Sequence, residues 1–314
     1  SVVLSDNSET LRGVKFSAQS YRSSSGLRAY RRQFLPTGTV RAGAVFIHGL
    51  GEHSGRHQRH LELFAHHGIH CIAFDLPGHG LTGGPRGHIA SLEIVQQLID
   101  ENAAILRTEI GKNRHLGLLG HSMGGLLSLD YLTRFPNEFD FSWISSPLID
   151  PASKASWLKL QLVMMIERVH PKFTLHGGVN SRLCKRDEAE LASTRTDELV
   201  HRQMTVRLGS ILIQSSYSLQ ENAMNMHAEL KLLMTHGGND QICRPEPARA
   251  LFDRLPCMLK DYTLFPDLLH EPFNDTGKEA VYERLESWVS KDLLPGFETP
   301  SIKSRSSSGL AHGT

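Results

Sequence analysis

Short apolar runs alternate with amphipathic stretches of helical length from about residue 40 onward. The apolar runs predict buried strands at residues 43–48, 70–75, 115–120 and 139–145. Apolar positions at helical spacing predict helices at residues 61–67, 91–110 and 123–135. This alternation is typical of βαβ units, which build a parallel sheet.

The two ends of the pattern differ from its middle. Residues 13–20 and 27–35 alternate on either side of a turn-like segment and predict an antiparallel hairpin. Between residues 147 and 228 no clear strand pattern is present, and the segment predicts helices instead. The alternation then resumes, with strands expected at residues 230–235 and 262–265 and helices at residues 245–255 and 278–293.

These boundaries predict an α/β fold, with a mostly parallel central sheet, helices on both faces and a helical cap inserted into the chain. We expect residues 1–146 to form the first part of the core, residues 147–228 the cap or lid, and residues 229–296 the second part of the core. The Ser- and Gly-rich residues 297–314 have little to bury and are expected to form a flexible tail.

The composition excludes several classes of protein. Apolar residues make up 39% of the 314 positions, which is enough for one large domain with an insertion. With 34 Lys and Arg against 33 Asp and Glu, the formal charge is only +1, so we expect no nucleic-acid partner. Nothing in the pattern specifies an oligomeric state.

Cysteine usage and hydropathy bear on location. Four scattered cysteines without a Cys-x-x-Cys pair predict reduced thiols in a reducing compartment. Residues 1–6 lack the basic and apolar regions of a signal peptide, and no apolar run reaches the roughly 18 residues of a membrane span. We therefore expect a soluble cytoplasmic protein that contacts membranes only peripherally, through the cap.

Histidine is frequent, with 18 residues, and one cluster raises the question of a metal site. The cluster comprises His53, His57, His60, His66, His67 and His70. It lacks the neighbouring Cys or the His-Glu-x-x-His arrangement that fixes zinc geometry. We therefore expect these side chains on a solvated loop and helix surface, and we expect neither a metal nor a cofactor.

The strongest chemical signal is Gly120-His-Ser-Met-Gly124, which fits the pattern Gly-x-Ser-x-Gly. An expected strand precedes Ser122 and an expected helix follows it, which is the context that a nucleophile elbow requires. The two glycines leave room for a turn so sharp that it raises the Ser122 hydroxyl above the sheet. Ser122 is the predicted nucleophile.

A serine needs a base to remove its proton, and in this kind of fold the partners follow in the order Ser, acid, His. Asp240 and His270 meet this order, and each lies just beyond an expected strand end, where open α/β sheets place their sites. The rival acids are Asp267, Asp275 and Glu271, and the rival base is His121. Asp240 is preferred because the acid must brace the imidazole from its far side.

The oxyanion formed during attack needs hydrogen-bond donors already in place. The N–H of Met123, directly after the nucleophile, is one expected donor. The other is expected from the Gly-rich loop after the strand at residues 43–48, where the N–H of Leu50 is the candidate.

Four segments carry a family resemblance: His48-Gly-Leu-Gly-Glu-His-Ser-Gly-Arg56, Asp75-Leu-Pro-Gly-His-Gly80, Gly83-Gly-Pro-Arg-Gly-His88 and Gly120-His-Ser-Met-Gly-Gly125. Together they resemble the monoacylglycerol lipase and lysophospholipase family of α/β-hydrolases, which are similar to serine aminopeptidases. The resemblance implies a lipase or esterase without a cofactor, in which the cap covers the triad and shapes an acyl pocket.

Five side chains are candidates for contact with the substrate. Glu52 and His53 are placed to reach the glycerol or head-group end, and His121 adjoins the nucleophile. Trp157 and Met164 belong to a very apolar run of the cap, residues 157–166. That run predicts core or pocket lining, a rim that dips into lipid, or a dimer contact.

The resemblance favours a monoacylglycerol or a similar single-chain lipid ester as the substrate. Its hydrolysis would proceed through an acyl-enzyme on Ser122. Lysophospholipids and simple carboxylic esters are close alternatives, and thioesters are a further one. An aminopeptidase of the same fold would need an acidic patch for the substrate amine. A binding protein that has lost catalysis is opposed by the presence of Ser122, Asp240 and His270.

Overall fold

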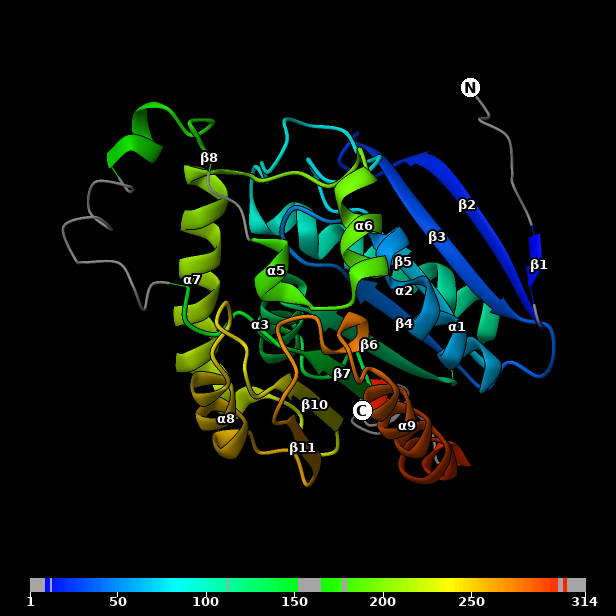
Figure 1. The fold of residues 1–314 in the computed structure, drawn as a ribbon. Coiled ribbons are helices and arrows are strands. Elements are labelled where there is room, and N and C mark those ends of the chain that lie inside the picture. Colours follow the sequence, from blue (N-terminus) through cyan, green and yellow to red (C-terminus); the bar gives the residue numbers. More distant parts are fainter. Residues whose placement is uncertain are drawn as a thin grey trace, which may run out of the picture.

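A nine-stranded sheet forms the centre of the molecule (Figure 1). The structure is a computed structural model that describes residues 9–11, 13–111, 113–151, 165–176, 180–298 and 302–303. The strand order is β1-β2-β3-β5-β4-β6-β7-β10-β11. The pairs β1–β2, β2–β3 and β3–β5 are antiparallel, and every pair from β5–β4 to β10–β11 is parallel. The strands are β1 Glu9–Leu11, β2 Val14–Arg22, β3 Arg28–Pro36, β4 Ala42–Ile47, β5 Ile69–Phe74, β6 His115–His121, β7 Phe141–Ser145, β10 Lys231–Gly237 and β11 Leu259–Phe265.

Helices cover both faces of this sheet. On one face, α1 and α9 bury Leu61, Phe64 and Val281; on the other, α2 and α3 bury Val95 and Leu126. The predicted α/β architecture, including the antiparallel hairpin of β2 and β3, is confirmed. The helices are η1 Ser54–His57, α1 Gln58–His66, α2 Leu92–Ile110, α3 Met123–Arg134, α5 Ser181–Cys184, α6 Glu188–Thr196, α7 Val206–Asn222, η2 Ala223–Asn225, α8 Pro245–Arg254, η3 Pro272–Asn274, α9 Glu279–Ser287, η4 Trp288–Leu293 and η5 Leu294–Glu298.

The order of the strands creates one special position at the centre of the sheet. β4 lies between β5 and β6, so the chain leaves β4 toward one side and later returns to its other side as β6. The loops after β4 and β6 therefore run in opposite directions. Crevices that bind ligands in open α/β sheets form where connections diverge in this way.

The expectation that residues 147–228 lack strands is wrong. Thr174–His176 (β8) and Gln203–Thr205 (β9) pair antiparallel as a separate two-stranded sheet. Strands of three residues are too short to show an alternating pattern. The rest of the described insertion is helical, and α7 packs with α3 in the core of the main sheet.

The apolar run at residues 157–166 lies largely outside the described residues, and so do Trp157 and Met164. Residues 165–169 are helical. Within the described part of the chain, no helix combines the length and the apolar character that crossing a membrane demands.

The expectation of a solvated histidine cluster is wrong for most of its members. His53, His57, His60 and His70 are buried. The ring of His60 packs edge-on against those of Trp143 and Phe273. Because α1 follows the loop after β4 directly, its first turn is covered by core aromatic residues instead of solvent.

The C-terminal segment holds contacts that its composition did not predict. Phe297 stacks on the ring of His115, and Ile302 is buried with its N–H donating to Asp140. Phe297 and Ile302 thereby pack near the start of β6.

Candidate active site

Ser122 occupies a strained turn between β6 and α3. Its φ of 55° and ψ of −117° lie where a residue with a side chain is rarely found. The two flanking glycines make the turn possible: a Cβ on Gly124 would lie 2.1 Å from the carbonyl oxygen of Ile47, and one on Gly120 would lie 2.5 Å from that of Gly124. Ser122 is also the N-cap residue of α3, so its hydroxyl lies at the positive end of the helix dipole.

The structure brings the three predicted triad residues together. His270 Nε2 lies 2.9 Å from Ser122 Oγ, and His270 Nδ1 lies 2.7 Å from Asp240 Oδ2. The other carboxylate oxygen of Asp240 accepts the N–H groups of Ile242 and Cys243 at 2.8 and 2.9 Å. Because Asp240 is fixed from both sides, the imidazole of His270 is held between acid and serine.

Two of the three rival acids, Asp275 and Glu271, are engaged elsewhere. Asp275 accepts the N–H of Leu269 and the guanidinium of Arg186, and Glu271 forms an ion pair with Lys185. These contacts turn both carboxylates away from His270 Nδ1, whose bond goes to Asp240.

Burial and charge act on the triad in opposite directions. Burial disfavours the imidazolium of His270, but the charge of Asp240 and its hydrogen bond outweigh this, so the pKa of His270 lies above its ordinary value of 6.5. Burial also disfavours the carboxylate of Asp240, yet the charge of His270 and bonds from His236 and His270 hold the pKa of Asp240 well below its usual range. Asp240 is therefore ionised, and Nδ1 of His270 donates to it, which leaves Nε2 to face the serine.

The loop after β4 is fixed by two buried side chains. His48 Nε2 accepts the N–H of Leu76 at 2.9 Å, so its Nδ1 carries the proton that it donates to the carbonyl of Gly49 at 2.7 Å. Burial lowers the pKa of His48 to about 4, which keeps this ring neutral. Glu52 Oε1 accepts the N–H of Gly49 at 2.6 Å and pairs with His57 Nε2 at 2.8 Å.

These anchors hold the loop close to the nucleophile. A Cβ on Gly49 would lie 3.2 Å from the Cβ of Ser122, so the backbone passes directly beside the serine. The N–H groups of Leu50 and Met123, the expected oxyanion donors, are bonded to no other described residue. Both remain available to a ligand.

Two of the predicted substrate contacts, His121 and His53, lie in different places relative to the cavity at Ser122. His121 lines the cavity at Ser122, and its ring lies 5.0 Å from that of His270. Burial and the charge of His270 lower the pKa of His121 to about 3, so it is neutral and does not compete as a base. His53 does not line the cavity; its Nε2 lies 2.9 Å from Oδ2 of Asp197, a residue of the insertion that does line it.

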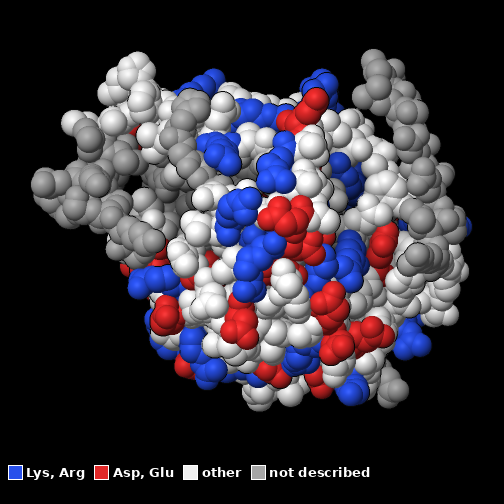
Figure 2. All heavy atoms as spheres, in the orientation of Figure 1, with Lys and Arg blue, Asp and Glu red and all other residues white. Residues whose placement is uncertain are grey.

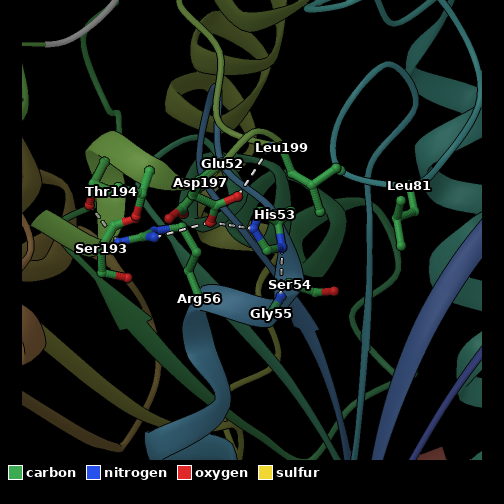
Figure 3. A network of polar contacts seen from close by, with 12 residues as sticks. Glu52, His53, Ser54, Gly55, Arg56, Leu81, Ser193, Thr194, Asp197 and Leu199 are labelled. Carbon is green, nitrogen blue, oxygen red and sulfur yellow. Dashed lines mark hydrogen bonds and ion pairs between the residues drawn. The ribbon is translucent and has the colours of Figure 1, made fainter. Parts of the chain in front are cut away.

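Figure 3 shows His53 and Arg56 converging on Asp197, which follows α6. Arg56 also donates to the hydroxyl of Thr194 at 2.6 Å, and the N–H of Leu199 closes the network on Asp197. The inserted segment is thereby tied to the loop beside Ser122.

A cavity of about 300 Å³ opens at Ser122 and is walled by the loop after β4, by α5, and by residues from α6 to β9. Most of the residues that line it have polar or charged side chains. The lining includes the carboxylates of Glu52, Asp197 and Glu271, each of which is paired with a cationic or imidazole group. The guanidinium groups of Arg195 and Arg202 are exposed and have no partner among the described residues.

Sequence reasoning did not identify Arg56, Lys185, Arg195 or Arg202 as site residues. Three of them lie in the insertion, where no strand pattern placed them relative to the sheet. The described residues contain no group of three or more His, Cys, Asp or Glu side chains that could hold a metal ion.

Residues 38–277 match the family described as serine aminopeptidase, S33. The chain belongs to the serine aminopeptidase S33 family. This S33 member is a serine hydrolase of the lipase and esterase type with the α/β-hydrolase fold.

Relatives and solved structures agree with this assignment. The monoacylglycerol lipase of Mycolicibacterium smegmatis is 27% identical over 88% of this chain and 98% of its own length. An uncharacterized abhydrolase domain-containing protein of Dictyostelium discoideum is 32% identical over 85% of this chain, which spans only 28% of that protein. The crystal structure of Paleococcus ferrophilus monoacylglycerol lipase superposes with a TM-score of 0.75 at 30% identity, covering 85% of this chain and 99% of that one.

Proposed function

We propose that this S33 member hydrolyses monoacylglycerol-like esters of single-chain lipids, with Ser122, His270 and Asp240 as its catalytic triad. The observation that carries the proposal is the unbroken line of hydrogen bonds from Ser122 Oγ through His270 to Asp240. We assign residues 147–228 to the cap over this site, which is supported by the contribution of α5 and α6 to the cavity wall.

In the first step, Ser122 Oγ attacks the ester carbonyl while His270 Nε2 takes the hydroxyl proton. Asp240 stabilises the imidazolium that forms, and the N–H groups of Leu50 and Met123 stabilise the negative charge on the carbonyl oxygen by hydrogen bonds. His270 then gives its proton to the departing alcohol oxygen, which breaks the ester bond and leaves an acyl-enzyme.

In the second step, water enters where the alcohol left. His270 Nε2 takes a proton from the water, whose oxygen attacks the acyl carbonyl, and the same two N–H groups stabilise the charge. Collapse of this intermediate returns the proton to Ser122 Oγ and releases the fatty acid. Both steps use the enzyme's own groups, and the water supplies the only added atoms.

The charges around the cavity weigh against an aminopeptidase. A substrate amine needs a free carboxylate, but Glu52 is engaged by His57 and Glu271 by Lys185. The exposed guanidinium groups of Arg195 and Arg202 would repel a cationic end. These charges support a neutral or anionic head group instead.

Arg195 and Arg202 favour a second candidate: a lysophospholipid whose head group is a phosphate monoester. Arginine binds phosphate through paired, charge-assisted hydrogen bonds. Figure 2 shows Lys and Arg side chains across the centre of the face that α6 occupies, with acidic side chains beside them.

The test compares rates on matched esters of one acyl chain: monoacylglycerol, lysophosphatidate, lysophosphatidylcholine and an aminoacyl amide. The main proposal predicts the highest kcat/KM on monoacylglycerol and no measurable amide cleavage; the reverse order would refute it. If lysophosphatidate is preferred, the double variant Arg195→Gln, Arg202→Gln should lose that preference through KM while keeping its rate on monoacylglycerol.

A further inference from the structure

One stretch of the insertion forms a series of hydrogen bonds and ion pairs with the loop that carries His270. We call residues 184–190 the strap and residues 267–278 the histidine loop. The N–H of Glu271 donates to the carbonyl of Cys184 at 2.8 Å. Arg186 binds Asp275 through its N–H at 2.7 Å and its guanidinium at 2.8 Å. The strap therefore lies directly against the segment that presents the base.

At the end of the strap near Ser122 is a buried ion pair. Lys185 is fully buried, and its Nζ lies 2.5 Å from Glu271 Oε2. Asn274 Nδ2 donates to the same oxygen at 3.0 Å. Glu271 follows His270 in the chain and lines the cavity at Ser122, so this pair holds its charges beside the base.

Stability alone does not explain such a pair. Removing two charges from water costs free energy, and well-packed apolar residues of similar volume often give a protein that is as stable or more stable. The strap is in any case held by Arg186 on Asp275 and by Lys278 on Asp187 and Glu190. A role for the charge of Lys185 itself is the remaining explanation.

We propose that Lys185 is a positioning residue of the active site, which neutralises Glu271 and so allows His270 to act as a base near neutral pH. This inference rests on the proposed catalytic role of His270. Lys185 acts through Glu271 and does not line the cavity.

The groups that face His270 come from every element around it. Asp240, which His236 also approaches, follows β10; His121 ends β6 and Ser122 follows it; and Glu52 follows β4. Glu271 and Lys185 complete the set from the histidine loop and the strap.

The carboxylates around His270 all raise its pKa. The negative charges of Asp240, Glu271 and Glu52 each raise the pKa of His270 against the effect of burial. Lys185 is the main group that opposes the effect of burial on Glu271 and keeps it ionised. Without Lys185, the charge that Glu271 retains would act on His270 unopposed. Without Glu271, the charge of Lys185 would act on His270 in the opposite sense.

The experiment measures kcat/KM against pH on a neutral monoacylglycerol, with glycerol release as the readout. In the Lys185→Met variant, the acidic limb should move to higher pH by about half a unit or more. In the Glu271→Gln variant it should move to lower pH, and in the double variant it should return close to the wild-type position. If Lys185→Met does not fold, the other two variants still decide the matter.

Lys278→Met is the matched control, because it breaks strap contacts of the same kind without changing a charge next to His270. The acidic limb of kcat/KM in this variant should have its midpoint at the wild-type pH. Limbs that do not move in the Lys185 and Glu271 variants, or that move in the same direction, would overturn the inference. Ser122→Ala separates this failure from that of the proposed function, since residual hydrolysis in Ser122→Ala would refute the triad itself.

Discussion

At the scale of single residues, the site depends on a few residues whose conformations are tightly fixed by their surroundings. Ser122 holds a backbone conformation that costs on the order of 1–3 kcal/mol. The neighbouring β6 and α3 impose that conformation, since both are buried in the core. The strain lifts the hydroxyl toward His270 Nε2, 2.9 Å away.

The raised pKa of His270 predicts the pH dependence of hydrolysis. His270 must be neutral to accept the proton of Ser122, so activity should rise with pH as the imidazolium loses its proton. Because the charge of Asp240 outweighs burial, the midpoint of the acidic limb of kcat/KM should lie above the ordinary histidine value of 6.5. A profile recorded on a neutral ester checks this, and a midpoint below about 6 would be inconsistent with Asp240 as the partner.

Which residues could be predicted depended on whether strand order constrained them. The order Ser, acid, His, with each residue beyond a strand end, was enough to prefer Asp240 over Asp275, and the two lie as expected relative to His270. Lys185 could not be found, because nothing in the insertion fixes its distance from the sheet. His60 was misplaced on the surface, because sequence alone does not reveal the aromatic side chains that cover it.

At the scale of elements, the loop after β4 determines how near a backbone N–H comes to Ser122. His48 fixes the carbonyl of Gly49, and Glu52 fixes its N–H. Neither interaction is visible as a pattern in the sequence, although the Gly-rich composition of the loop was. The short strands β8 and β9 were missed for a related reason, since three residues carry no periodicity.

Replacing Gly49 by Ala should disturb this loop. The added Cβ would lie 2.8 Å from Glu52 Oε1 and 3.2 Å from the Cβ of Ser122. We expect a loss of about 1–3 kcal/mol in unfolding free energy from overpacking. Displacement of the Leu50 N–H should also lower kcat by about 10²-fold or more.

Thermal unfolding and steady-state kinetics measure the two effects. Gly38→Ala is the matched control, because its Cβ would meet nothing within 4 Å. Wild-type kcat in Gly49→Ala would show that the loop does not stabilise the oxyanion.

At the scale of the whole molecule, the sheet and the insertion contribute different parts of the site. The sheet places Ser122, Asp240 and His270 at the ends of β6, β10 and β11, and the insertion supplies α5 and α6 to the cavity wall. Because most residues of the described wall have polar or charged side chains, we assign it to the head group of the substrate. We propose that the acyl chain binds to apolar residues of the proposed cap, whose sequence at residues 157–166 suits flexible chains.

This division predicts a preference for longer acyl chains. Each buried methylene contributes about 0.8 kcal/mol, so kcat/KM should rise at least about tenfold between acetate and medium-chain esters. A series of p-nitrophenyl esters that differ only in chain length measures it. Strong preference for acetate or butyrate would contradict an acyl pocket in the cap.

The catalytic role of Ser122 is tested most directly by labelling with a fluorophosphonate probe, followed by identification of the modified peptide. The wild-type protein should be labelled on Ser122 alone. Labelling should be lost in Ser122→Ala and be slowed by at least about 10³-fold in His270→Ala, which lacks the base. A wild-type protein that remains unlabelled, or a Ser122→Ala variant that still reacts and hydrolyses esters, would contradict the assignment of Ser122 as the nucleophile.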